Sequence, residues 1–177
     1  MSLPNNFDSR TVAKSFRVNR NALSALQSEA KRLNLSVNTM VNQLLISYAE
    51  YGRFAQRAHS LNLTHRTFAE ILAATSEEKL VTAGQNAGKS APLAMISSKK
   101  GEVTVNTVLE YIQDLSAHAN LFEFNETNER GHWTITLLHE LGVKWSLFLE
   151  NYIAEAFKAA AAQPQITSSD RAVTIRI

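Results

Sequence analysis

The sequence of 177 residues predicts an α+β fold in two domains, and three features support this. Residues 11–51 contain one short alternating pattern followed by two helical patterns, residues 53–98 are mostly helical in pattern, and residues 105–177 mix helical periods with strand-like alternation. We therefore expect an N-terminal domain over residues 1–54. We expect a C-terminal α+β domain with a small antiparallel sheet over residues 55–177.

The N-terminal domain begins with a strand pattern at residues 11–18, because apolar and polar side chains alternate there. One face is mainly apolar and carries Val12, Phe16 and Val18, with Lys14 interrupting it. The other face carries Ala13, Ser15 and Arg17. A strand with two such different faces is expected to bury one of them and expose the other.

Two amphipathic helices are expected after this strand. Asn19 has the side chain of a helix N-cap, and apolar residues recur at helical spacing through residues 20–33. Asn34 is expected to end this helix. Ser36 is a second N-cap, and the helix that follows could run to Tyr51 or well beyond, because no helix-breaking residue precedes Gly52.

Periodicity predicts further helices and strands in the rest of the chain. The expected helices cover Thr67–Ala74, Glu77–Gly84, Val105–Ala119 and Gly142–Ala162. The expected strands cover Leu121–Asn125, Trp133–Leu138 and Ala172–Ile177. Polar residues 126–131 are expected to connect the first two strands as a hairpin, and Ser97–Gly101 is expected to be a loop.

The short N-terminal strand predicts a homodimer. A strand of eight residues is not stable alone, and two small helices give a monomer too little core. In a dimer, the two strands would pair antiparallel and the helices of the two copies would interlock, which gives each strand a partner and enlarges the core. The resulting two-stranded ribbon has about the width that the major groove of B-DNA admits. Its outer face would present Ala13, Ser15 and Arg17 to base edges.

The charge distribution also favours a polyanion as partner of the N-terminal part. Up to Arg66 the chain has nine basic and three acidic residues, whereas the remainder has nine basic and thirteen acidic residues. The net charge of +2 hides this asymmetry. A nucleic acid would therefore bind the first part and not the second.

The order of these parts resembles a known family. Ser15–Val18, the Asn19-capped helix and the segment Asn34–Asn42 follow one another as strand, helix, turn and capped helix. In this order residues 10–52 resemble the ribbon-helix-helix family of Arc/MetJ-type repressors, although Lys14 replaces an apolar residue that is usual there.

The resemblance implies a sequence-specific regulator of transcription, a repressor by analogy, that binds double-stranded DNA as an intertwined homodimer. In such proteins the outward side chains of the strand read bases, and the start of the second helix holds a backbone phosphate. It thus implies base-reading roles for Ala13, Ser15 and Arg17. It implies phosphate-binding roles for Ser36, Val37, Asn38 and Thr39.

The C-terminal half gives weaker signals. The segment Leu80–Ser90 has three residues between its glycines where a phosphate-binding loop needs four, so nucleotide hydrolysis is not expected. The five histidines lack the tight spacing of a metal site, and no metal or cofactor is expected. The segment Thr134–Ser146 either lines a pocket or forms a packing corner, and packing is favoured. Its surroundings faintly resemble vinyl-reductase-like and haem-NO-binding-like sensor domains, with no ligand residue to transfer.

Several functions stay open at this point. The C-terminal domain either joins dimers into a tetramer or senses a small-molecule effector. An alternative is an antitoxin-like or plasmid-partition protein whose C-terminal half binds a protein partner, and a further one is a nonspecific architectural protein. An enzyme is not expected, because no nucleophile–base pair and no paired carboxylates stand out. No apolar run is long enough to span a membrane, and the chain has no cysteine. The absence of cysteine agrees with a cytoplasmic protein.

Overall fold

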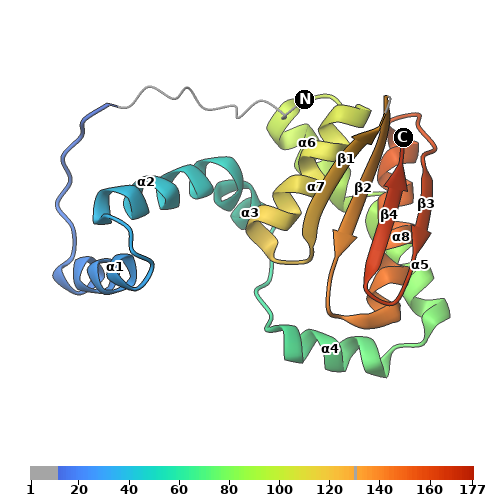
Figure 1. Ribbon diagram of the computed structural model, residues 1–177, viewed down its shortest axis with the longest axis horizontal. Coiled ribbons are helices and arrows are strands. Elements are labelled where there is room, and N and C mark those ends of the chain that lie inside the picture. The colour runs from blue at the N-terminus through green and yellow to red at the C-terminus, as the bar shows by residue number, and fades with distance from the viewer. Residues whose placement is uncertain (1–11, 130) are drawn as a thin grey trace. The chain divides into compact units, whose positions relative to one another are not determined.

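The computed structural model describes residues 12–129 and 131–177 of the chain. It is an α+β protein whose elements form two compact units, Met1–Arg53 and Phe54–Ile177. Figure 1 labels the helices and strands of both units. No described helix has both the length and the apolar character that a membrane crossing requires.

The first unit contains two capped helices, as the sequence predicts. Helix α1 spans Arg20–Arg32, and the Asn19 Oδ1 atom accepts hydrogen bonds from the first turn of its backbone. Asn34 follows with a left-handed φ of 55°, a conformation that ends a helix. Helix α2 spans Val37–Ser47, and the Ser36 Oγ atom accepts the N–H of Thr39 at 3.0 Å. Both predicted caps are therefore confirmed.

The predicted N-terminal strand is not formed in the single chain. Residues 12–19 have no regular secondary structure, and residue 11 lies outside the described residues. A strand needs a neighbour to accept and donate its ladder hydrogen bonds, and no other strand of this unit is described. The second helix continues beyond α2 as a π-helical turn, Tyr48–Gly52, and then as α3, Arg53–Arg57.

The second unit contains the remaining helices. These are α4 (His65–Ala74), α5 (Glu77–Gly88), α6 (Ala91–Lys100), α7 (Val105–Ala119) and α8 (Gly142–Ala159). The prediction of a loop at Ser97–Gly101 is wrong, because α6 continues through Lys100 and ends at Gly101 with a φ of 82°. Pro92, which stands at the start of α6, fits the first helical turn because that turn needs no N–H donor from it.

A four-stranded antiparallel sheet forms the other layer of this unit, and the predicted single sheet is confirmed. Its strands are β1 (Glu123–Glu129), β2 (His132–Leu138), β3 (Gln165–Ser168) and β4 (Ala172–Arg176), in the order β1-β2-β4-β3. The hairpin connection is shorter than expected, because β1 extends to Glu129 and pairs there with His132. Strand β3 has no counterpart in the prediction.

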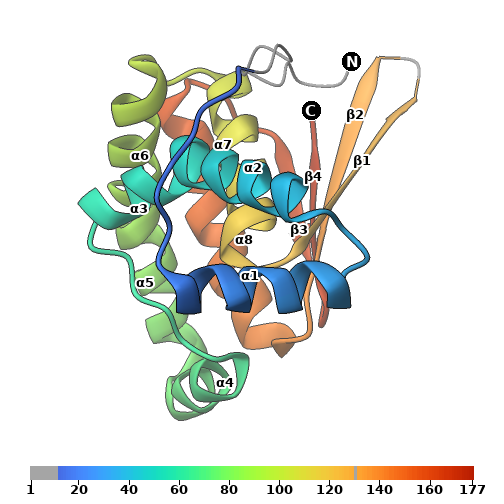
Figure 2. The ribbon, with the colours of Figure 1, turned by 90° about the vertical axis from the view of Figure 1, so that its left-hand side faces the viewer.

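The core of the second unit lies between one face of this sheet and the helices. Ile135 and Leu137 of β2 are buried, and they stand opposite Ile175 and Val173 of β4. Helix α7 contacts β1, and α8 contacts β3 and β4 (Figure 2). Phe157 of α8 is fully buried. The apolar alternation of β2 and β4 therefore determines which face the helices cover.

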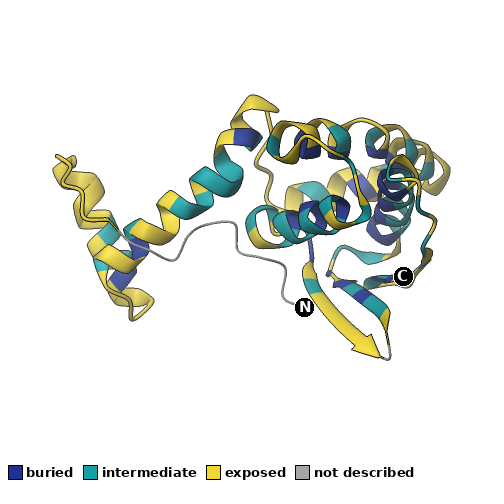
Figure 3. Cartoon of the chain, turned by 90° about the horizontal axis from the view of Figure 1, so that it is seen from above, coloured by how far each residue is buried: buried dark blue, intermediate teal, exposed yellow. Residues whose placement is uncertain are grey.

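Strand β1 lies at an edge of the sheet and is the most exposed of the four strands (Figure 3). Its exposed residues include three carboxylates, those of Glu123, Glu126 and Glu129. Only its second residue, Phe124, is half-buried. This strand therefore belongs to the sheet through its backbone and contributes little to the core.

Helices α5 and α8 pack side by side at a very short separation (Figure 1 and Figure 2). Gly84 and Gly88 stand at the contact, where an added Cβ would lie 2.5 Å from the Phe148 carbonyl oxygen and 2.4 Å from the Tyr152 carbonyl oxygen. The glycines that resembled an incomplete phosphate-binding loop thus serve helix packing. Two small residues four positions apart allow two helix backbones to approach closely.

Helix α4 is tied to α8 at its C-terminal end. The Lys144 Nζ atom donates hydrogen bonds to the carbonyl oxygens of Leu72, Ala73 and Thr75, at 3.2, 2.8 and 2.7 Å. These carbonyls belong to the last turn of the helix, where a cation is favoured. Near the other end, the Phe68 ring meets the Trp145 ring edge to face at 5.0 Å.

Candidate functional site

The residues predicted to read bases lie in the segment before α1. Ala13, Ser15 and Arg17 are all exposed, as are the other residues of 12–19. Their side chains are therefore accessible to a partner, as base-reading residues must be. The alternating positions that would face inward in a paired ribbon are also exposed, with Phe16 at 68% and Val18 at 55%.

The residues predicted to hold a phosphate lie at the start of α2. The first N–H groups of a helix have no acceptor within the helix, and those of Val37 and Asn38 are in this position. The N–H of Thr39 is already donated to Ser36 Oγ, and the two hydroxyl oxygens lie 2.7 Å apart. The first turn of α2 contains no acidic residue that would repel an anion.

Charges in the described part of the first unit are mostly positive. Its acidic residues within 12–53 are Glu29 and Glu50. The Arg32 guanidinium donates to the Glu29 carboxylate at 2.5 Å, and this hydrogen bond lowers the pKa of Glu29 below its ordinary value. Because one acid is paired within α1, the basic residues Lys14 and Arg17 before the helix are not neutralised by it.

Large apolar side chains of the first unit face solvent. Ala30 and Met40 are the residues of 12–53 that are buried, whereas Leu44 and Leu45 of α2 are 53% and 54% exposed. Water-exposed apolar surface costs about 25 cal/mol per Å² relative to burial. Few residues of this part of the chain are therefore buried for its size.

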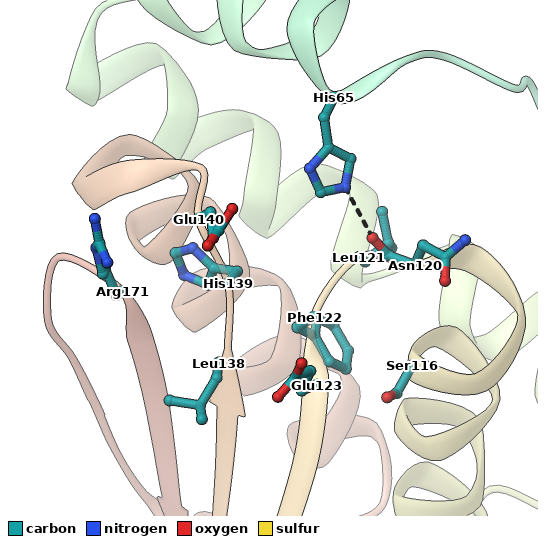
Figure 4. A pocket seen from close by; sticks show the side chains of 10 residues that line it. All are labelled: His65, Ser116, Asn120, Leu121, Phe122, Glu123, Leu138, His139, Glu140 and Arg171. Atoms are coloured by element: carbon teal, nitrogen blue, oxygen red, sulfur yellow. Dashed lines mark hydrogen bonds between the residues drawn. The ribbon is translucent and has the colours of Figure 1, made fainter.

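The second unit contains a cavity of about 530 Å³ (Figure 4). Its lining comes from the start of α4, the end of α7, the first part of β1, the end of β2 and the turn between β3 and β4. Residues that represent these segments are His65, Phe122, Glu123, His139, Glu140 and Arg171. The volume falls within the range of small-molecule sites.

His139 joins this cavity to the core. The ring is 7% exposed, its Nδ1 atom accepts the N–H of Leu141 at 3.3 Å, and its Nε2 atom lies 2.9 Å from Ser146 Oγ. Since Nδ1 accepts, Nε2 carries the hydrogen and donates it to Ser146. Burial lowers the pKa of the His139 imidazole below its ordinary value of 6.5, and the negative charge of Asp170 opposes this in part.

The contact between Ser146 and His139 was not predicted from the sequence, in which no nucleophile–base pair stands out. The two residues are seven apart and meet only because the chain turns at Gly142, which has a φ of 76°. The direction of the hydrogen bond matters for chemistry. A base that activates serine must accept the hydroxyl proton, whereas here the imidazole donates to a serine that is fully buried. The pair holds the corner between β2 and α8.

The segment Thr134–Ser146, for which a pocket and a packing corner were both considered, does both. His139 and Glu140 line the cavity, while Trp145 is buried and packs against Phe68 and Phe148. The remaining lining residues were not anticipated, because they come from segments far apart in the sequence. Among the described residues no group of three His, Asp or Glu side chains is arranged to hold a metal ion.

Comparison of the chain with models of protein families, with curated proteins and with solved structures gives no match.

Proposed function

We propose that this protein is a sequence-specific regulator of transcription that binds the major groove of double-stranded DNA as a homodimer. The observation that carries the proposal is the combination, in residues 12–53, of an exposed alternating segment, two capped helices and an unburied apolar surface. Pairing two copies of the segment would give both the missing strand ladder and a shared core.

The apolar surface supports the dimer. Phe16 and Val18 alternate with Ser15 and Arg17, so pairing two segments would turn the first pair toward the helices and the second pair outward. Leu44 and Leu45 of α2 would be buried by the second copy. A two-stranded ribbon of this kind fits the major groove of B-DNA.

Arg17 is the residue to which we assign most of the base selectivity. A guanidinium donates two parallel hydrogen bonds to O6 and N7 of guanine, and such a contact discriminates against other bases by about 1–3 kcal/mol. Ser15 would add one hydrogen bond to a base or a phosphate, and Ala13 would contact a thymine methyl group.

The start of α2 would hold the DNA backbone. The N–H groups of Val37 and Asn38 and the hydroxyl groups of Ser36 and Thr39 gather at this helix end. The positive end of the helix dipole attracts a phosphate there. This contact would position the ribbon without reading the sequence.

The test is selection of bound duplexes from a random DNA pool by the full chain, with two variants run in parallel. Arg17→Ala should lose the enriched motif, because the guanine contact is gone. Arg66→Ala removes the same charge from an exposed residue of α4 and should retain the motif.

Three outcomes decide the matter. A motif that disappears with Arg17→Ala and survives Arg66→Ala supports the proposal. Binding without any enriched motif identifies a nonspecific architectural protein instead. A chain that binds no duplex at salt concentrations of about 50 mM, where phosphate contacts are strong, contradicts DNA binding altogether.

A further inference from the structure

The cavity of the second unit has features of a built binding site. Several of its walls are fixed by hydrogen bonds that do not involve a ligand. His65 Nε2 meets the Asn120 carbonyl oxygen at 3.1 Å, and Trp145 Nε1 donates to the Leu121 carbonyl oxygen at 3.3 Å. The His139 N–H donates to the Arg171 carbonyl oxygen at 2.9 Å. A site whose walls are held in this way is largely formed before a ligand arrives.

The two histidines of the lining offer the cavity a hydrogen-bond acceptor and no donor. A carbonyl oxygen only accepts, so His65 Nε2 carries the hydrogen of its bond to Asn120, and Nδ1 of the neutral ring is an acceptor. In Figure 4 this second nitrogen lies on the side of the ring that faces His139 and Glu140. Both nitrogens of His139 are occupied by Leu141 and Ser146, so this ring offers the cavity no donor.

The charged side chains of the lining are two carboxylates and one guanidinium. Glu123 and Glu140 are exposed at the rim, and neither has an ion-pair partner among the described residues. The cation of the lining, Arg171, is next to Asp170, with 4.0 Å between Nε and Oδ2. The rim therefore offers two uncompensated carboxylates and one partly compensated guanidinium.

The remaining surface is apolar. Phe122 is buried at 6% exposure, Leu121 is half-buried, and Leu138 is 41% exposed beside Glu123, its partner across the strands. Figure 4 shows Phe122 and Leu138 with Glu123 on one side of the cavity, and His139 with Glu140 on another. A ligand that fits has an apolar body for the first group and donors with positive charge for the carboxylates.

We propose that this cavity is a binding site for a small organic cation, an amine or amidine with an aromatic or aliphatic body. The site lies wholly in the second unit and uses none of the residues assigned to DNA binding. Ligand binding at this cavity and DNA binding by the first unit can therefore be tested separately.

The test compares three probes of the same size and different charge: benzamidine, benzamide and benzoate. Each is titrated into the full chain to about 10 mM, and the backbone amide signals of Phe122, Leu138 and His139 are followed by NMR. Benzamidine should shift them with a dissociation constant on the order of 1 mM, as expected for so small a ligand. Benzamide should bind several times more weakly, and benzoate should not bind.

Two double variants show which carboxylates attract the benzamidine charge, and a single variant tests whether the ligand occupies the cavity. The double variant Glu123→Gln/Glu140→Gln should weaken benzamidine binding about tenfold and leave benzamide unchanged, because exposed charge contacts contribute modestly each. The control Glu126→Gln/Glu129→Gln removes the same charge from exposed positions of β1 outside the lining and should bind as the wild type does. Leu138→Trp should fill the cavity and abolish binding of benzamidine.

The proposal is overturned if benzoate binds as tightly as benzamidine, or if benzamidine shifts none of the three amides. Equal weakening by the two double variants also overturns it, since that would indicate attraction by the net charge of the unit and not by this site.

Discussion

At the scale of single residues, His139 is the side chain whose protonation the fold controls most directly. Its ring is buried, donates to Ser146 and accepts from Leu141. Protonation would place a second hydrogen on Nδ1, where the Leu141 N–H already points. Folding therefore favours the neutral ring over its charged form.

This predicts a loss of stability at mildly acidic pH. The pKa of His139 is lowered in the folded state from its ordinary value of 6.5. Below pH 6.5 the His139 side chain binds a proton in the unfolded chain but not in the folded chain. The contribution of the neutral His139 ring to stability is therefore complete above pH 6.5 and declines as the pH falls toward the lowered pKa. Asp170 reduces the effect, because its charge favours the protonated ring.

Urea unfolding at pH 7.5 and 5.5 measures this decline. The two tryptophans of the chain, Trp133 and Trp145, both lie in the second unit, so their fluorescence reports on that unit. His139→Gln should reduce the shift of the midpoint between the two pH values, since glutamine does not titrate. The control His132→Gln, at an exposed position of β2, should retain it. An unchanged shift in His139→Gln would mean that other groups cause it.

At the scale of elements, the contact between α5 and α8 depends on the absence of two side chains. A Cβ at residue 88 would lie 2.4 Å from the Tyr152 carbonyl oxygen and 2.9 Å from the Tyr152 Cα, both backbone atoms that cannot rotate away. Gly88→Ala must therefore separate the two helices, although alanine is the better helix former.

We expect Gly88→Ala to destabilise the second unit by about 1–3 kcal/mol, as overpacking of a tight contact does. The unfolding midpoint from tryptophan fluorescence measures the change. Asn86→Ala, at an exposed position of the same helix, should be neutral or slightly stabilising. Equal midpoints for Gly88→Ala and the wild type would show that the helices separate at no cost.

The sequence predicts well those helices and strands whose caps and apolar periodicity lie within the element itself. Asn19 and Ser36 mark helix starts with their own side chains, and Thr104 caps the helix that begins at Val105, as its periodicity predicts. Strand β2 buries Ile135 and Leu137, which are two positions apart, so its pattern predicts both the strand and its buried face.

The elements that were missed depend on partners distant in the sequence. Strand β3 has four residues with one half-buried side chain, Ile166, and its pairing with β4 is what makes it a strand. The polar end of β1 has the sequence pattern of a turn, because only its hydrogen-bonded pairing with β2 keeps it extended. The last turn of α6 reads as a loop, since Ser97 and Ser98 disfavour helix in isolation.

The two candidate sites differ in the same respect: one is formed by a continuous segment, and the other by residues that are distant in the sequence. The N-terminal residues Arg17 and Ser36 could be named because they belong to one continuous pattern of about forty residues. The cavity could not, since His65, Glu123 and Arg171 come together only through the packing of α4 and the sheet. His139 was singled out within a distinctive segment, but its contact with Ser146 requires the turn at Gly142.

At the scale of the whole molecule, the distribution of buried residues differs between the two units. The second unit has a full core of its own, whereas residues 12–53 bury Ala30 and Met40. If a second copy completes the core of the first unit, a charge placed on its apolar surface should prevent association, because a buried unpaired charge is costly.

Sedimentation of the full chain at micromolar concentration tests this. The wild type should sediment as a dimer or a larger assembly. Leu44→Glu, in the exposed apolar surface of α2, should dissociate this contact and weaken self-association at least about a hundredfold. Leu61→Glu changes a more exposed leucine, at 85%, between α3 and α4 and should leave association intact. A monomeric wild type would contradict the shared core.

The three carboxylates on β1 bear on how copies of this chain can meet. An edge strand of seven residues with unpaired backbone groups is a template on which a neighbouring chain can extend the sheet without limit. Where the β1 strands of two copies pair, they stand about 4.8 Å apart, so Glu123, Glu126 and Glu129 would be brought against the like charges of the other copy. This repulsion opposes growth of the sheet through contacts between β1 strands.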